Sequence, residues 1–382
     1  MLIGLSIAVG AIAWSVNMIT LPVAMFFPLL WAKSPSRVVA AAVSAGYFLA
    51  ASLGLPQGVG NFYAADLWPG ILLWAMASVG FTLVHAILWT RQPGRVRAAR
   101  YIVAMMLMAL PPFGITGWAH PLTAAGILFP GWGRFGLGAT AILLVIISGR
   151  RWQIAVAVLL GLYAWSATDR TQPKVPDSWK GVDLEIGQNL GRDGSLSYHR
   201  DLIAAVRAKA GDARFVVLPE SALGFWTPTV ARLWQDGLRG TRVTVIAGAA
   251  VIDDTGYDNV MVAISAAKAL VLYRERMPVP VSMWQPWRAW MGQGGGARAH
   301  FFANPVVEVA GIKIAPLICY EQLILWPILQ SMLHDTDIIV ASGNGWWTSG
   351  TSIIAIQRAS AGAWSRLFGV PIVTAFNQNP KE

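Results

Sequence analysis

The chain has 382 residues, of which 55% are hydrophobic and 13% are charged, and its mean hydropathy is +0.52. Soluble domains carry about 25% charged residues, so this composition argues against an ordinary soluble protein and favours a membrane protein. The formal net charge is +10, and residues 1–167 contribute most of it with nine Lys or Arg and one acid. These basic residues lie in short loops between hydrophobic runs, which is typical of loops that orient a membrane protein and not of nucleic-acid binding.

Seven hydrophobic runs occupy residues 1–167 and predict a transmembrane helical bundle of about six or seven spans. No basic segment precedes the first run and no clear A-x-A-like site follows it, so we interpret it as a membrane segment and not as a signal peptide. Basic loops follow the second, fourth and sixth runs, which places all three on the cytoplasmic side and the chain after about residue 168 outside the cytoplasm. The runs are 2–15, 18–32, 38–53, 67–90, 101–118, 122–149 and 153–167.

Residues 168–180 are polar and contain proline, which predicts a linker. From residue 181 to 382, alternating strand and helix patterns predict an extracytoplasmic α/β layered domain. The expected strands are 182–188, 214–219, 243–251, 260–265, 270–276, 306–309, 313–318, 337–342 and 371–376, and the expected helices are 196–210, 229–238, 322–333 and 352–368.

Two predicted strands end in reactive side chains. Glu220 follows one apolar strand, and Cys319, the single cysteine of the chain, follows another, with Glu321 two residues later. A thiol at the start of a helix is stabilised as thiolate, and backbone N–H groups there can stabilise an oxyanion. Glu220 could take the thiol proton during attack and return it to a leaving group. Spacing alone favours the alternative, a buried structural cysteine and an ion-paired glutamate.

The residues around these positions resemble the nitrilase, or carbon-nitrogen hydrolase, superfamily. Residues 218–222 (LPESA) are similar to its catalytic-glutamate motif, and residues 318–321 (ICYE) are similar to its nucleophile motif in apolipoprotein N-acyltransferases. Residues 341–347 (ASGNGWW), 357–359 and 369–377 also resemble those acyltransferases, which place a multi-span bundle ahead of a nitrilase domain. The Trp-rich region that begins with residues 273–280 (YRERMPVP) resembles a family of plasmid conjugal transfer proteins.

This resemblance implies a nitrilase-like αββα domain and a Cys–Glu–Lys triad that attacks an ester, amide or thioester carbonyl. Cys319 and Glu220 match the family's nucleophile and base, but Glu275 stands where the lysine is expected. Arg276 is the candidate substitute for the lysine, although neighbouring strand residues point to opposite faces and Arg cannot share protons as Lys can. Without a compensating cation, several glutamates near Cys319 would raise the pKa of its thiol.

The resemblance also assigns supporting positions around the nucleophile. The matched motifs contain Tyr320, Glu321, Asn344, Trp346 and Trp347. The family's second supporting glutamate has no obvious equivalent here, because Pro280 is followed by Val, Ser and Met. The chain also stops six residues after Phe376, so the domain either ends early by nature or is truncated at its C-terminal end.

Two functional hypotheses follow for a protein of the bacterial inner membrane with a periplasmic C-terminal domain. The first is a membrane-bound acyltransferase or amidase that supports conjugal plasmid transfer, with membrane lipids as acyl donors and a protein or pilin-like acceptor. The second is a catalytically inactive membrane scaffold of the conjugation apparatus. No metal or cofactor is expected, because the five His show no ligand spacing and the Gly-rich residues 292–296 lack the setting of a phosphate loop. A channel or transporter is disfavoured by the scarcity of charges in the runs.

Overall fold

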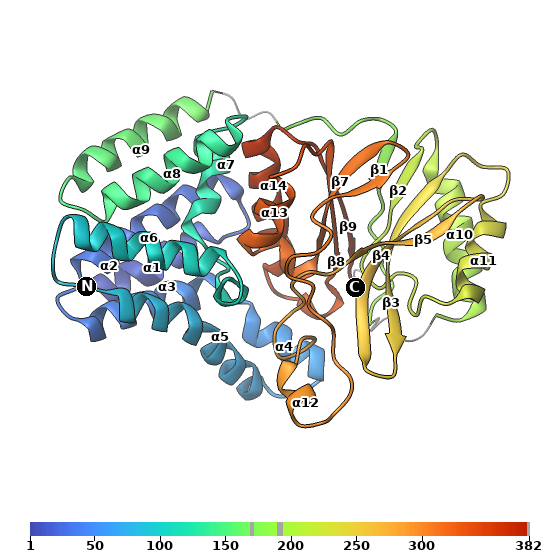
Figure 1. Ribbon diagram of the computed structural model, residues 1–382, viewed down its shortest axis with the longest axis horizontal. Coiled ribbons are helices and arrows are strands. Elements are labelled where there is room, and N and C mark those ends of the chain that lie inside the picture. The colour runs from blue at the N-terminus through green and yellow to red at the C-terminus, as the bar shows by residue number, and fades with distance from the viewer. Residues whose placement is uncertain (169–171, 189–193, 380–382) are drawn as a thin grey trace. The chain divides into compact units, whose positions relative to one another are not determined.

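A computed structural model describes residues 1–168, 172–188 and 194–379, and it divides the chain into two compact units (Figure 1). The helical unit contains Met1–Pro173, Leu323–Trp326 and Gly350–Val370. The α/β unit contains Lys174–Gln322, Pro327–Ser349 and the segment that starts at Pro371. The predicted linker, 168–180, falls partly on residues 169–171, which lie outside the described residues.

The helical unit is assembled from many short helices around an aromatic core. Trp14 Nε1 donates to the hydroxyl of Tyr47, which itself donates to the carbonyl of Ala119, so three distant segments are joined by buried hydrogen bonds. Phe27 stacks on Tyr47 with ring centroids 4.6 Å apart. The helices are α1 (Leu2–Ala13), η1 (Met18–Phe26), α2 (Phe27–Lys33), α3 (Arg37–Ala51), α4 (Leu55–Tyr63), α5 (Leu67–Leu88), α6 (Arg95–Ala109), η2 (Phe113–Thr116), η3 (Pro121–Ala124), α7 (Ala125–Leu128), α8 (Gly133–Ile147), α9 (Trp152–Ser166) and α14 (Ile353–Phe368).

Local chemistry interrupts the hydrophobic runs. The side chain of Asn17 accepts a hydrogen bond from the Ile19 amide and starts a 3₁₀ helix that carries Pro22 inside it. Helix α6 ends at Ala109, directly before Leu110 and Pro111, because a proline disfavours helical geometry in the residue before it. The run 122–149 likewise divides into η3, α7 and α8. A hydropathy average does not detect such breaks, because proline and small residues can occur within an apolar run.

The predicted multi-span membrane bundle is therefore wrong. Among the described residues, α5 alone is long and apolar enough to cross a membrane, and counting the pair α3 and α4, bent by 55°, as one broken span raises the number to two at most. The 15-residue helices α3, α6, α8 and α9 are each about 22 Å long, against a hydrocarbon core of about 30 Å. The extracytoplasmic placement of the C-terminal part relied on seven spans and loses that basis.

The α/β unit contains two sheets. The first has the order β1-β2-β3-β4-β5, in which β1, β2 and β3 are parallel and β4 and β5 are antiparallel hairpin strands. The second has the order β6-β7-β8-β9, in which β7, β8 and β9 are parallel. The strands are β1 (Trp179–Gly181), β2 (Phe215–Val217), β3 (Thr244–Asp253), β4 (Gly256–Ile264), β5 (Ala269–Arg274), β6 (Val307–Val309), β7 (Ile312–Ile318), β8 (Ile338–Asn344) and β9 (Ile372–Asn377).

Alternating side chains of the first sheet fill two different cores. Val216 and Val245 face helices α10 (Leu196–Ala210) and α11 (Pro228–Gly237), which Figure 1 shows beside this sheet. Phe215 and Val217 instead pack with Ile318 and other residues of the second sheet, because successive strand residues point to opposite faces. The α/β half of the fold prediction thus corresponds to two sheets packed face to face with helices on the outer face of the first.

Most predicted elements of this unit coincide with observed ones within a few residues, and two differ. The expected strand 182–188 is replaced by β1, after which the chain makes single contacts, such as the Ile186 amide with Asn377 Oδ1. The expected helix 322–333 begins only at Leu325, as α13 (Leu325–Ser331), because the residues after Cys319 form the short 3₁₀ turn η4 (Cys319–Gln322).

Candidate active site

Glu220 lies beyond the end of β2, where the chain turns sharply over β3. Its backbone and that of Ser221 pass so close to Gly248 that a side chain at this glycine would overlap the Glu220 Cα. Ser221 adopts a left-handed conformation with φ +60°. The Glu220 side chain is only 5% exposed. The close approach of β3 therefore fixes the carboxyl in a buried position at the edge of the sheet.

Cys319 lies at the corresponding end of β7 in the second sheet. Its φ is +44°, a left-handed conformation that costs a residue with a β-carbon about 1–3 kcal/mol and often accompanies functional sites. The residue is 7% exposed and its thiol is hydrogen-bonded to Glu220. Cys319 begins the four-residue η4 and not a long helix, so the stabilisation of the thiolate that was expected from a helix start does not apply. Glu220 is instead the group that contacts it.

Asn259, on β4, joins two buried carboxyl groups. Its Nδ2 donates to Glu220 Oε1 at 2.7 Å and to Glu275 Oε2 at 2.8 Å. Both accepting oxygens bind the same nitrogen, so they lie no more than about 5.5 Å apart. Two full negative charges at that distance repel by about 3 kcal/mol at an effective dielectric constant of about 20. This repulsion disfavours the state in which both carboxyls are ionised.

The pKa of Glu220 is raised to about 7, mainly because burial removes the carboxylate from water. Hydrogen bonds from Asn259, the Cys319 thiol and the Asn344 backbone amide partly offset this effect, whereas the negative charge of Glu321 adds to it. Burial also raises the pKa of Glu275 well above its usual value, and the charges of Glu321 and Glu220 raise it further. A carboxyl that titrates near neutral pH suits a general base.

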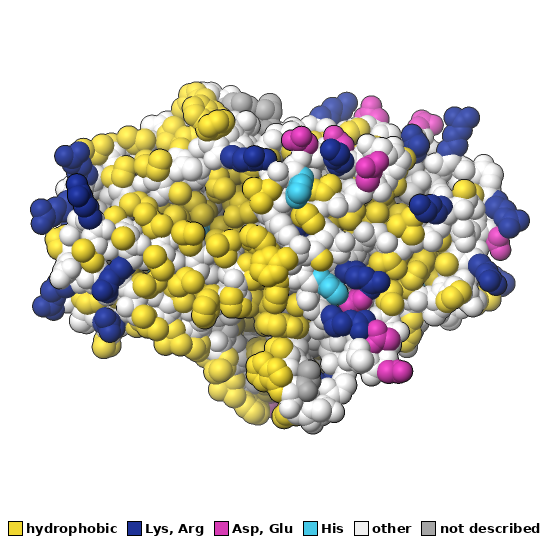
Figure 2. Space-filling model, viewed as in Figure 1, with side chains coloured by type: hydrophobic (Ala, Val, Ile, Leu, Met, Phe, Trp, Pro, Cys, Tyr) yellow, Lys and Arg dark blue, Asp and Glu magenta, His cyan; other side chains and the backbone are white. Residues whose placement is uncertain are grey.

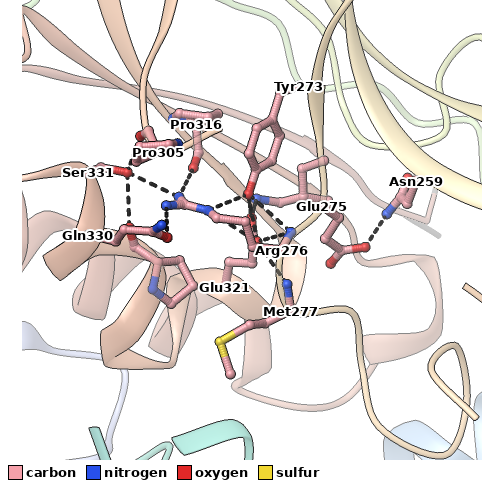
Figure 3. Close-up of polar contacts among 12 residues, drawn as sticks. Asn259, Tyr273, Glu275, Arg276, Met277, Pro305, Pro316, Glu321, Gln330 and Ser331 are labelled. Carbon is pink, nitrogen blue, oxygen red and sulfur yellow. Dashed lines mark hydrogen bonds and ion pairs between the residues drawn. The ribbon is translucent and has the colours of Figure 1, made fainter. Parts of the chain in front are cut away.

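Arg276, the proposed substitute for the missing lysine, points into a separate polar network (Figure 3). Its guanidinium donates from Nε to Tyr273 Oη and from Nη1 to Gln330 Oε1, and Nη2 donates to Ser331 Oγ and to the carbonyl of Pro316. The side chain is completely buried. Neither Cys319 nor Glu220 is among these partners, so these contacts of Arg276 are those of a structural residue.

Glu321 anchors the same network. Its carboxylate accepts hydrogen bonds from the Tyr273 hydroxyl, from the backbone amides of Arg276, Met277 and Ile318, and it lies 4.0 Å from Arg276 Nε. A carboxylate with this many donors and a nearby cation is well compensated although it is fully buried. Glu321 therefore ties the end of β5 to the turn that presents Cys319 (Figure 3).

The other predicted positions lie around the β8 end and the nucleophile turn. Asn344 ends β8, where its amide contacts Glu220 and its Oδ1 accepts from Asn377 Nδ2 at 2.8 Å. Trp347 Nε1 donates to the Asn344 carbonyl, and Trp346 is buried. Tyr320, next to the nucleophile, has a raised pKa because it is buried. These contacts support the shape of the site, and no described contact assigns them a chemical step.

Sequence reasoning missed Asn259, the residue that links Glu220 to Glu275. The available signal was an amide directly before the apolar residues 260–264 of strand β4, a position at which a polar side chain needs a buried partner. Among the described residues, no group of three or more His, Cys, Asp or Glu side chains is arranged to hold a metal ion.

Comparison with known proteins identifies the family of the chain. The family model for carbon-nitrogen hydrolases matches residues 49–366, which includes much of the stretch for which a membrane bundle was expected. The conjugal transfer protein TraB of Agrobacterium fabrum is 67% identical over 99% of this chain and 92% of its own length. The probable conjugal transfer protein TraB of Sinorhizobium fredii is 60% identical over 97% and 96% of the two chains.

An apolipoprotein N-acyltransferase of Photobacterium profundum is a more distant relative. It is 25% identical over 69% of this chain and 59% of its own length. The family model covers most of the chain and two relatives match it almost end to end. This chain therefore belongs to the carbon-nitrogen hydrolase family.

Proposed function

We propose that this chain is a thiol-dependent acyl-transfer enzyme that supports conjugal plasmid transfer, with Cys319 as nucleophile and Glu220 as base. The observation that carries the proposal is the hydrogen bond between the Cys319 thiol and the Glu220 carboxylate, at a strand end where Cys319 adopts a left-handed backbone conformation. A nucleophile within hydrogen-bond reach of a buried base is the arrangement that covalent catalysis requires.

The chemistry follows from these two groups. Glu220 takes the thiol proton as Cys319 Sγ attacks the carbonyl carbon of an ester, amide or thioester. When the tetrahedral intermediate collapses, the bond to the leaving group breaks, and Glu220 returns the proton to that group. The remaining thioester on Cys319 is then attacked by an acceptor amine or by water, whose proton passes to Glu220 and from there to the released Cys319 sulfur. Each cycle begins and ends with a thiol and a carboxylate.

The role in conjugation is inferred from the relatives, which are named as conjugal transfer proteins and match nearly the whole chain. The similarity to an apolipoprotein N-acyltransferase favours a lipid as acyl donor and a protein, such as a pilin-like protein, as acceptor. Conjugation machinery is the corresponding partner.

We also propose that the helical unit contacts a lipid membrane. Of the 40 large hydrophobic side chains that are exposed among the described residues, 31 lie between Met1 and Trp165, and Figure 2 shows hydrophobic side chains gathered over this region. Contiguous exposed apolar surface of this kind marks a protein or membrane contact. Helix α5, with Leu72 and Met76 exposed near its middle, is the candidate for a membrane crossing.

The deciding experiment is mass spectrometry of the purified full-length protein after incubation with phospholipid vesicles. The proposal predicts an acyl adduct on Cys319 that is absent in Cys319→Ala and strongly reduced in Glu220→Gln. In the donor cell, Cys319→Ala is expected to lower plasmid transfer at unchanged protein level. Unchanged transfer with normal amounts of Cys319→Ala protein would sink the catalytic role.

The competing function is a catalytically inactive membrane scaffold of the conjugation apparatus. The observation that favours it is Glu275 at the position where the family's lysine is expected, while Arg276 directs its guanidinium to Tyr273 and Gln330. Absence of any Cys319 adduct in folded protein, together with normal transfer by Cys319→Ala, would be the scaffold's signature.

A further inference from the structure

The pair formed by Glu220 and Glu275 is unusual because both carboxyls are buried and both depend on one amide. Glu220 is 5% exposed and Glu275 is 1% exposed, and Asn259 Nδ2 uses one hydrogen for each of them. The backbone reinforces the arrangement, since the Glu275 amide donates to the Asn259 carbonyl at 2.9 Å. The three side chains are therefore held in one fixed relation.

The two carboxyls differ in the support that each receives. Glu220 also contacts the Cys319 thiol and the Asn344 amide, so an ionised Glu220 is stabilised by three donors. Among the described residues, Glu275 accepts one side-chain hydrogen bond, through Oε2 from Asn259. Its Oε1 is buried without a hydrogen-bond partner in that part of the chain, as is Oε2 of Glu220, so the difference between the two carboxyls lies in the thiol and amide donors of Glu220. A buried ion with one donor is far more costly than a buried ion with three, so the geometry favours a proton on Glu275.

The charged groups around Glu275 point in the same direction. Glu321 and Glu220 both oppose its ionisation, while Arg276 directs its guanidinium to Tyr273, Gln330 and Ser331. The Tyr273 hydroxyl stays uncharged, because burial raises its pKa well above the usual value. Nothing that faces Glu275 within the described residues supplies the cation that an ionised carboxylate would need.

We propose that Glu275 is a neutral carboxylic acid in the resting protein, and that it acts through Asn259 as a positioning residue which leaves Glu220 as the single ionised base beside Cys319. This inference deepens the proposed function and rests on it only for the role of Glu220. A neutral carboxylic acid at this position and the family's lysine limit the negative charge of the site in different ways. The amine would offset the negative charge of the site, whereas the protonated Glu275 avoids adding a second one.

The consequence for the thiol is direct. With Glu275 neutral, it adds no negative charge that opposes formation of the Cys319 thiolate, and the ionised Glu220 is the acceptor of the proton. With Glu275 ionised, a second buried negative charge would further raise the pKa of the thiol and suppress attack. The protonation state of Glu275 therefore determines how reactive the cysteine is at neutral pH.

Infrared spectroscopy of the wild-type protein, labelled with ¹³C-glutamate and purified at full length in detergent, tests the assignment without any substrate. A shifted C=O band of a protonated glutamate should persist to about pH 8.5, where ordinary glutamates and Glu220 are ionised. The band should be lost in Glu275→Gln, and it should remain in Glu220→Gln and in the exposed control Glu308→Gln. Loss of the wild-type band below about pH 8 overturns the proposal. Because this measurement uses the wild-type protein, it does not depend on whether a variant folds.

Alkylation of Cys319 by iodoacetamide across pH provides the functional readout, and it is unambiguous because the chain has one cysteine. Glu275→Gln replaces one neutral side chain by another, so the midpoint of alkylation should stay close to that of wild type. If Glu275 were ionised, the same change would remove a negative charge and lower the midpoint by about one pH unit, a tenfold gain in thiolate. Such a shift contradicts the proposal.

These outcomes are separable from those of the proposed function. A persistent carboxylic acid band in a protein that forms no acyl adduct would leave the assignment of Glu275 intact and refute the phospholipid reaction. An acyl adduct in a protein without that band would support the phospholipid reaction and refute the assignment of Glu275.

Discussion

The helical unit and the α/β unit solve the problem of burying polar groups in opposite ways. In the helical unit, several buried hydroxyls bond to carbonyls one turn earlier in their own helices, as Ser44 does with Ala40 and Thr140 with Gly136, and the bonds that cross between segments, such as that of Tyr47, also join uncharged groups. In the α/β unit, the buried polar groups are charged side chains from several elements, among them Glu220, Arg276 and Glu321. Local hydroxyl bonds need no partner element, whereas buried charges require a fixed network.

The outer surfaces differ as well. The helical unit exposes apolar side chains along α5 and most other helices, while the α/β unit exposes ion pairs such as Arg239 with Asp236. A unit that is apolar both inside and outside fits an apolar surrounding, and a unit with a charged surface and a charged interior fits water and chemistry. The membrane contact proposed for the helical unit would account for this difference.

The largest expected effect concerns the buried network of the α/β unit. Arg276→Met removes the cation near Glu321 and the donors to Gln330 and Ser331, so we expect a loss of about 3–5 kcal/mol in the free energy of unfolding. Arg239→Met is the matched control, because its ion pair with Asp236 is exposed and surface pairs contribute about 0–1 kcal/mol. Denaturant unfolding followed by tryptophan fluorescence measures both, and equal losses in the two variants would contradict the contrast between the units.

The next effect concerns the exposed surface of the helical unit. Met76 is 66% exposed near the middle of α5, and Met76→Lys should cost about 2.5–3.5 kcal/mol if this position lies in the bilayer core. The variant should therefore shift from the membrane fraction to aggregates or to the soluble fraction after alkaline washing. Ile252→Lys, at an exposed position of β3, is the control and should fractionate as wild type does. If Met76→Lys also behaves as wild type, the surface does not contact lipid.

A third effect follows from the raised pKa of Glu220. The folded protein holds this proton up to about pH 7, whereas a free glutamate carboxyl has a pKa of 4.5. Because the unfolded chain releases the proton first, stability falls as pH rises from about 4.5 to 7, by up to about 3 kcal/mol, and is not recovered at higher pH. Glu220→Gln lacks this titration, so it should be more stable than wild type at pH 8 and show a smaller difference at pH 4. A stability difference that is independent of pH would contradict the raised pKa.

How far the sequence predicted the structure also differs between the units. In the α/β unit, changes from strand to helix periodicity and polar boundary residues marked the elements, so that α10 spans the predicted 196–210 and β7 the predicted 313–318 within a residue. In the helical unit, the runs are apolar throughout, so their hydropathy did not reveal where helices end, as at Asn17 and before Pro111. Hydropathy measures the affinity for an apolar environment and not the length of the helix that results.

The sequence by itself determined the family and the two strand ends that carry Glu220 and Cys319, because motifs and strand ends are properties of contiguous residues. The position of Glu275 at the family's lysine stays a prediction from the same motifs. Only the tertiary structure decided which groups meet. It assigned Arg276 to Glu321, Gln330 and Ser331, and it placed Asn259 between Glu220 and Glu275. Such pairings depend on the register of β4 against β5 and on the turn after β7, which bring together residues far apart in the chain and leave no local signal in the sequence.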